Sequence, residues 1–195
     1  MTIDQHSKFN QLLNKELLKT KASDYKGTVI NYEHLYEKDV FYNEKNGNKV
    51  RVTINTKTNE IVENGIITKV KLDQLDIFSP QTRMDFRVSI NEEKKVSKPT
   101  TSPEHEREKD RLSYRHELFR IDLTQVKSQN SHSQDRGQGW EKAKVSHELE
   151  VEIIDLKPIF EEYKLHLKGL PNQYYSILQI FLTNIRLLAR SSNKF

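Results

Sequence analysis

Three glutamates alternate with apolar residues near the end of the chain, in the segment His147-Glu148-Leu149-Glu150-Val151-Glu152-Ile153. Side chains two residues apart on a β-strand point to the same face, so the three carboxylates form one acidic row. Such a row repels itself unless basic side chains or a cation neutralise it. On a single strand the pattern is typical of a hydrated sheet surface. It is also the pattern of a divalent-metal site that acts on phosphate.

Charged side chains recur with the same spacing on other segments, where basic residues are mixed in. The rows that share a face are Arg120, Asp122 and Thr124; Arg107, Lys109 and Arg111; Lys49 and Arg51; Lys69 and Lys71; and Asp85, Arg87 and Glu93. Apolar residues occupy the opposite face where the pattern is clearest, as in Phe119, Ile121 and Leu123. The sequence therefore predicts a sheet with one charged face and one apolar face.

Two arrangements of this sheet are open. Its charged face lies outward in water, or the sheet curls into a barrel with the charged face inside and the apolar face beneath helices. Two predicted C-terminal helices need an apolar surface to cover, which favours the barrel. A charged interior needs a very polar ligand. Carboxylates for a metal ion, with guanidinium and ammonium groups for phosphate oxygens, are the matching set.

Composition restricts the class of protein. The chain has 195 residues, 31% charged and 34% apolar, which predicts one domain over residues 1–195. A formal net charge of +4 mildly favours polyanionic partners. The absence of cysteine excludes disulfides, thiolate metal sites and a cysteine nucleophile. No apolar run approaches the roughly 20 residues of a membrane helix, and we expect no membrane partner.

Apolar periodicity predicts a helix over residues 4–20 and two more over 158–167 and 173–190. From about residue 28 to 154 the period is two. The predicted strands lie at 50–54, 66–72, 86–91 and 145–154, with one long extended segment over 106–126. Residues 97–103 are predicted to form a loop, and the polar segment 127–139 a mobile loop. The expected fold class is α+β, an antiparallel β-barrel with packed helices.

Several segments resemble, in order and spacing, motifs of the fungal-type RNA 5′-triphosphatases, which belong to the triphosphate tunnel metalloenzyme superfamily. These proteins are the β subunits of the yeast mRNA-capping enzyme. Three segments carry the resemblance, residues 106–114, 119–126 and 147–153, and three more are similar, residues 76–80, 85–90 and 184–190. The resemblance covers nearly the whole chain and depends on the three ordered motifs together.

The resemblance assigns roles to individual residues. Glu148, Glu150 and Glu152 match the C-terminal acidic motif that binds the metal and orients the attacking water. Arg120, Asp122 and Thr124 match the motif on the preceding strand, and both motifs are expected to be catalytic. The expected phosphate-binding residues are Arg107, Lys109, Arg111, Arg51 and Lys69, and the other expected tunnel residues are Glu93 and Asp39.

The same resemblance implies an activity and its setting. A hydrolase dependent on Mg²⁺ or Mn²⁺ would remove the γ-phosphate from the 5′-triphosphate end of nascent mRNA, the first step of capping. The implied partners are 5′-triphosphate RNA, the mRNA guanylyltransferase subunit and a second copy of the chain, and the implied location is the nucleus. Free nucleoside triphosphate and polyphosphate present similar phosphate groups and stay open as substrates.

One family feature is not found in this sequence. The family's first barrel strand carries a second acidic motif, Glu-x-Glu, and no such strand precedes the helix predicted over residues 4–20. The peptide that docks the guanylyltransferase in the family is not found either. We therefore expect a barrel that is incomplete at its first strand, with unpaired backbone groups and half of its metal ligands missing. The chain is then a piece of a longer protein or a degenerate homologue.

Two functions follow from these expectations. The leading hypothesis is a metal-dependent polynucleotide 5′-triphosphatase. The alternative is a truncated or degenerate, non-catalytic homologue that acts as an RNA-binding or subunit-interaction module.

Overall fold

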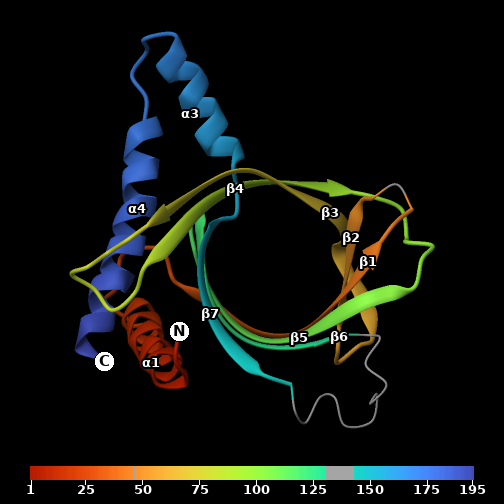
Figure 1. Ribbon diagram of the computed structural model, residues 1–195. Coiled ribbons are helices and arrows are strands. Elements are labelled where there is room, and N and C mark those ends of the chain that lie inside the picture. The colour runs from red at the N-terminus through yellow and green to blue at the C-terminus, as the bar shows by residue number, and fades with distance from the viewer. Residues whose placement is uncertain (46, 131–142) are drawn as a thin grey trace.

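The computed structural model describes residues 1–45, 47–130 and 143–195 (Figure 1). The elements in chain order are α1 (Ile3–Thr20), β1 (Asn31–Asn43), β2 (Lys49–Asn55), β3 (Glu60–Ile77), β4 (Phe86–Lys95), β5 (Pro103–His116), β6 (Phe119–Asn130), β7 (Val145–Ile153), α3 (Lys157–Leu167), α4 (Tyr174–Ser191) and the 3₁₀ helix η1 (Ser192–Lys194). The predicted helices and most of the predicted strands are confirmed.

The strands form one seven-stranded sheet in the order β4-β3-β2-β1-β5-β6-β7, and every neighbouring pair is antiparallel. The sheet curls so strongly that its strands trace most of a ring in Figure 1. The expected antiparallel, barrel-like fold is therefore confirmed. In the described part of the chain the ring is open between its edge strands β4 and β7.

Helix α1 packs on the convex face of the sheet, beneath β5, β6 and β7 (Figure 1). It starts with a capping box, because the Thr2 side chain accepts from the backbone N–H of Gln5 and the Gln5 side chain accepts from that of Thr2. Its apolar stripe enters the main core, which consists of Phe9, Leu13, Leu17, Tyr114, Leu123 and Leu188. This packing fixes the convex face and leaves the opposite face for charged side chains.

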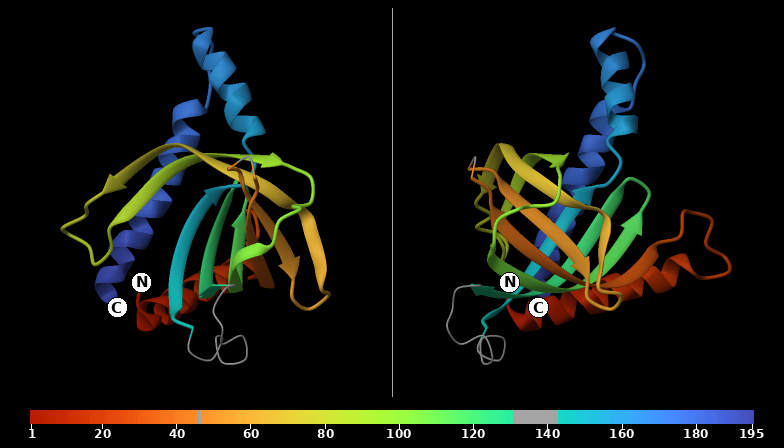
Figure 2. Two further views of the ribbon diagram at one scale, coloured as in Figure 1. Left: turned by 45° about the vertical axis from the view of Figure 1, so that its right-hand side comes forward. Right: turned by 90° about the vertical axis from the view of Figure 1, so that its right-hand side faces the viewer.

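The C-terminal helices cover less of the sheet than the sequence predicted. Helix α4 contacts the core through Leu188 and through Phe181, which stacks on Phe119 of β6 at a ring-centroid distance of 6.2 Å. Phe195, after η1, lies edge-on against Phe9 at a ring-centroid distance of 4.8 Å. Helix α3 and the start of α4 protrude from the sheet (Figure 2), and Phe160 and Tyr175 on them are exposed. The expectation that these two helices cover the apolar face is wrong for α3, because α1 occupies that face.

The prediction of one long extended segment over residues 106–126 is wrong. These residues lie in the β5–β6 hairpin, which has a two-residue turn at Glu117 and Leu118. Glu117 adopts φ 51°, a left-handed conformation that is uncommon outside glycine. The Thr28 hydroxyl donates to the Glu117 carboxylate at 3.0 Å. No glycine or Asn-Gly pair marks this turn, so the sequence pattern alone did not reveal it.

The loop predicted over residues 127–139 is wrong at its start. Lys127 lies within β6, paired with Glu108 on β5 and with Val145 on β7, because ladder hydrogen bonds extend the strand despite its polar composition. Residues 131–139 lie outside the described residues. Among the helices of the described chain, none combines the length and apolar character needed to cross a bilayer.

Candidate functional site

The sheet register brings all the predicted site residues onto one face. On β6 and β7, Arg120 pairs with Glu152, Asp122 with Glu150, and Thr124 with Glu148. The same face continues across β5, β1, β2, β3 and β4. We call it the concave face; its charged and hydroxyl residues include Glu37, Asp39, Arg51, Thr53, Lys69, Glu93, Arg107, Lys109, Arg111, Ser113, Arg120, Asp122, Thr124, Glu148, Glu150 and Glu152.

Asp39 and Lys109 form the most deeply buried ion pair of the concave face, with side chains that are 1% and 8% exposed. The Thr53 hydroxyl donates to Asp39 Oδ1 at 2.8 Å, which holds the carboxylate toward Lys109. Burial lowers the pKa of Lys109 below its usual value, and the Asp39 carboxylate acts in the opposite direction. The pair thus keeps a cation in a place where solvation alone would disfavour it.

Arg111 and Asp122 form a second buried group beside this pair. The Arg111 guanidinium lies 3.6 Å from the carboxylates of both Glu37 and Asp122. The Ser113 hydroxyl donates to Asp122 Oδ1 at 2.7 Å. Asp39 and Asp122 are therefore held in the same way. A hydroxyl fixes one oxygen of each carboxylate, and the other oxygen faces a cation.

Arg120 joins the buried group to the glutamate strand. Its guanidinium donates to Glu152 at 2.5 Å and approaches Asp122 at 3.1 Å. Burial acts to lower the pKa of Arg120, but the Asp122 and Glu152 carboxylates outweigh it and raise the pKa above its ordinary value. Arg120 thus stays charged and carries a planar fork of donors, the geometry suited to phosphate oxygens.

The remaining predicted residues lie nearer solvent. Arg107 donates to Glu148 at 3.0 Å, and Glu93 lies 3.5 Å from Arg51 and 3.4 Å from Lys69. Glu150 is exposed on the concave face and forms no ion pair with another described residue. Of the three glutamates, Glu150 is therefore the carboxylate available to a ligand.

Unsatisfied polar atoms gather on the same face. Within the described chain, Arg51 Nε, Arg111 Nε and Thr124 Oγ1 are buried without a hydrogen-bond partner. An unpaired buried donor costs about 1–3 kcal/mol, so such groups are rare in a purely structural sheet. Their concentration here is expected of a site where a bound molecule, with small side-chain shifts, supplies the acceptors.

The concave face fits a hard divalent cation only in part. Carboxylate oxygens are the donors that Mg²⁺ and Mn²⁺ prefer, and Mg²⁺ commonly uses one or two protein carboxylates with water and substrate phosphates. Alternate residues on a strand are about 7 Å apart, so Glu148, Glu150 and Glu152 cannot all contact one ion directly. In agreement, the described residues contain no group of three side chains placed to hold a metal ion together.

Among the residues that contact the buried ion pairs, Glu37, Thr53 and Ser113 were not predicted from the sequence. Glu37 and Asp39 are two apart on β1, so the period-two acidic pattern used for β7 would have revealed Glu37. The hydroxyls offer no such pattern. Asp85 was predicted to share a face with Arg87 and Glu93, but it precedes β4 and accepts from the Ser79 backbone N–H at 2.9 Å.

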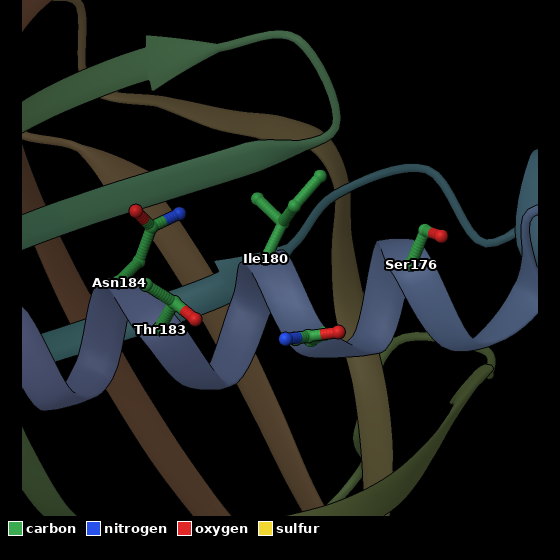
Figure 3. A pocket seen from close by; sticks show the side chains of 5 residues that line it. Ser176, Ile180, Thr183 and Asn184 are labelled. Atoms are coloured by element: carbon green, nitrogen blue, oxygen red, sulfur yellow. The ribbon is translucent and has the colours of Figure 1, made fainter.

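A separate surface pocket lies on α4 and involves none of these residues. It is lined by Ser176, Gln179, Ile180, Thr183 and Asn184, which all project from this one helix (Figure 3). Its lining has no charged side chain and no member of the concave face. The candidate site therefore lies on the concave face and does not include this pocket.

A curled antiparallel sheet with buried ion pairs inside and a helix-covered apolar face outside defines a tunnel-type β protein. The chain belongs to the family described as mRNA capping enzyme, beta chain, whose model matches residues 1–194. Membership rests on nearly the full length of the chain.

Known relatives agree with this assignment. The chain is 29% identical over 195 residues to the mRNA-capping enzyme subunit beta of Schizosaccharomyces pombe. The aligned region covers 97% of this chain and 60% of that protein. It therefore spans less than two thirds of that relative's length.

Solved structures share the fold. The S. pombe Pct1 RNA triphosphatase superposes with a TM-score of 0.84 at 27% identity, over 97% of this chain and 69% of Pct1. Pct1 has also been solved in complex with the Spt5 CTD. The Mimivirus capping enzyme triphosphatase has a TM-score of 0.57 at 15% identity, over 97% of this chain and 85% of that chain, and this likeness concerns the fold alone.

Proposed function

We propose that this chain is the tunnel part of an RNA 5′-triphosphatase, which removes the γ-phosphate from the 5′-triphosphate end of mRNA before capping. The observation that carries the proposal is the set of unpaired buried Nε–H groups and cations on the concave face. Family membership supplies the reaction class, since relatives are named as capping-enzyme β subunits and RNA triphosphatases.

In this proposal the basic residues bind and orient the triphosphate. Arg107, Lys109, Arg111 and Arg120 project from two adjacent strands, so they present cations along the length of a phosphate chain. Asp39 and Asp122 hold Lys109 and Arg111 in place through ion pairs. Fixed cations stabilise charge that develops on the transferred phosphoryl group without rearranging during the reaction.

The acidic row is proposed to orient the attacking water. Of the three glutamates, Glu150 is the one without a cationic partner in the described chain, which supports a role for it as acceptor of a proton from that water. Glu150, with Glu148 and Glu152 acting directly or through water, would hold Mg²⁺ or Mn²⁺. When bound, the ion supplies neutralisation of phosphate charge.

The biological setting is part of the same proposal. The partners proposed are 5′-triphosphate RNA, the guanylyltransferase subunit and a second copy of the chain, and the proposed location is the nucleus. The net charge of +4 supports a polyanionic substrate.

The test is phosphate release from triphosphate-ended RNA with Mn²⁺ or Mg²⁺. Glu150→Ala and Arg120→Ala should each lower the rate at least about a hundredfold, because each removes a group aimed at the reacting phosphate. Glu108→Ala is the matched control, since Glu108 lies on β5 with its side chain on the convex face. Equal rates in all three variants would exclude the catalytic assignment.

The second candidate, a non-catalytic RNA-binding module, predicts a different result in the same preparations. RNA would bind with a steep salt dependence, and phosphate release would stay at background. Substitution of Glu148, Glu150 or Glu152 by alanine would leave the RNA affinity unchanged.

A further inference from the structure

The two open ends of the curled sheet differ in charge. We call one end the lysine rim. It consists of four segments that lie together: the β1–β2 turn, the β4–β5 connection, the end of β6 and the start of β7. The register shows this meeting, because Asn43 pairs with Lys49, Tyr42 with Pro103, and Lys127 with Val145. Figure 2 (right) shows the β1–β2 turn and the β4–β5 connection at this end and the β5–β6 turn at the other.

Six exposed lysines occupy the lysine rim, namely Lys45, Lys49, Lys95, Lys98, Lys127 and Lys144. None forms an ion pair with another residue that the structure describes. Glu44, the acidic residue in the β1–β2 turn, is already engaged by the Thr100 backbone N–H at 3.0 Å and by the Thr101 hydroxyl at 3.2 Å. Against these six lysines stand the acidic residues Glu44 and Glu104, so the described part of the lysine rim presents net positive charge to solvent.

The opposite end is close to neutral. Four segments form this end: residues 21–30, which contact the β5–β6 turn through Thr28, the β2–β3 turn, the β5–β6 turn and the residues after β7. They contribute five basic residues and four acidic ones, namely Lys21, Lys26, Lys57, Arg115 and Lys157 with Asp24, Glu60, Glu117 and Asp155. Lys57 is further engaged over the Tyr36 ring, 4.1 Å from its centroid. An approaching polyanion is thus attracted to the lysine rim and not to this end.

The positive charge of the lysine rim is continuous with the concave face. Lys49 shares that face with Arg51 on β2, and Lys95 shares it with Glu93 on β4. Moving inward from this rim along β7, Glu148 comes first and Glu152 last. A basic path therefore runs from the outer surface to the proposed site.

We propose that RNA enters the tunnel through the lysine rim, with its 5′-triphosphate leading and its following nucleotides lying across the rim lysines. This inference rests on the proposed function and adds a direction to it. The γ-phosphate then reaches furthest in, toward Arg120 and Glu152, and the nucleotide end stays near Lys49. Lysines are point charges without base-reading geometry, so the contact is to backbone phosphates and is independent of sequence.

The test compares two triple variants in binding to a single-stranded 5′-triphosphate RNA of about 20 nucleotides, followed by fluorescence anisotropy over a range of salt. Lys45→Ala/Lys98→Ala/Lys144→Ala removes three loop lysines of the lysine rim. Lys26→Ala/Lys57→Ala/Lys157→Ala removes three exposed basic residues of the opposite end, and none of them belongs to the strands of the concave face. Inorganic tripolyphosphate, which is too short to reach beyond the tunnel, is measured in parallel.

The lysine-rim variant should lose at least about tenfold in RNA affinity and reduce the salt slope by about 2, since each phosphate contact on single strands contributes about 0.7. Its tripolyphosphate affinity should not change, and the opposite-end variant should keep wild-type RNA affinity. Equal losses in the two variants, or no loss in either, would overturn the entry path. A lysine-rim variant that loses binding to polyglutamate but not to RNA would overturn it in favour of an acidic protein partner.

Failure of the proposed function gives a separate result. The wild-type chain would release no phosphate from any triphosphate substrate, and the anisotropy comparison between the two variants would still decide the entry path.

Discussion

Two walls of the curled sheet differ in how they are supported. The wall of β5, β6 and β7 packs against α1, and Leu123 in it is 0% exposed. The wall of β3 and β4 carries no helix over most of its length, and Leu72, Leu75 and Ile90 in it are about 60% exposed (60%, 61% and 59%). The most deeply buried ions of the concave face lie on or beside the supported wall. Packing on one face of a strand thus fixes the charges on its other face.

The unsupported wall is held chiefly at its tip. The turn between β3 and β4 meets η1, where the Arg83 backbone N–H donates to Ser192 Oγ at 3.2 Å and Asn193 donates to the Gln81 carbonyl at 2.7 Å. Arg83 also donates to the Phe195 carbonyl. Local stability should therefore fall from β6 toward β4, except at this turn.

The largest contrast is expected from leucine truncation. Leu123→Ala should lower the free energy of unfolding by about 4 kcal/mol, because it leaves a cavity between the sheet and α1. Leu75→Ala, on the exposed side of β3, should change it by less than about 0.5 kcal/mol. Urea unfolding followed by circular dichroism measures both. Similar losses in the two variants would contradict the difference between the walls.

The ion pairs of the two walls should differ next. Asp39→Asn leaves the Lys109 ammonium buried without its carboxylate and should cost about 3 kcal/mol. Glu93→Gln breaks ion pairs with Arg51 and Lys69 that are much more exposed, and should cost less than about 1 kcal/mol. Thermal and urea unfolding of the two variants measure both losses of unfolding free energy. A cost for Glu93→Gln as large as that for Asp39→Asn would show that both walls hold their charges equally.

A smaller effect is expected at the tip of the unsupported wall. Ser192 is 0% exposed, and its hydroxyl accepts from Arg83 and donates to the Ala189 carbonyl at 2.6 Å. Ser192→Ala should cost about 1 kcal/mol and speed amide exchange selectively in β3 and β4. Hydrogen exchange read by mass spectrometry resolves the strands. Faster exchange spread evenly over β5, β6 and β7 as well would contradict this local role.

The smallest effect concerns the contact between α1 and the supported wall. His6 is buried against His147 at a ring-centroid distance of 5.1 Å. Burial is the main cause that lowers the pKa of His6 below 6.5, and the charge of His147 acts in the same direction. The unfolded chain then binds more protons than the folded one below about pH 6.5, so stability is retained above that pH and lost as the pH falls. His6→Phe should flatten this decline. If the melting temperature of His6→Phe falls with acid as steeply as that of the wild type, other groups cause the decline.

The period-two charge pattern predicted the concave face because a strand's geometry fixes which side chains share a face. Arg120, Asp122 and Glu150 were therefore placed together correctly. The turn at Glu117 was missed because its left-handed conformation is adopted by a residue that does not favour it. The hydroxyls of Thr53 and Ser113 were missed because their partners are set by sheet register, which depends on the whole curled sheet and not on local spacing.

The central claim is that the concave face binds triphosphate, and calorimetric titration with inorganic tripolyphosphate tests it most directly. Arg107 on the concave face and Lys38 on the convex face are matched, with side chains 29% and 30% exposed and one ion pair each. We expect the wild-type chain to bind one equivalent, Arg107→Gln to bind at least about tenfold more weakly, and Lys38→Gln to bind like the wild type. Absence of saturable binding, or equal weakening in the two variants, would contradict the claim.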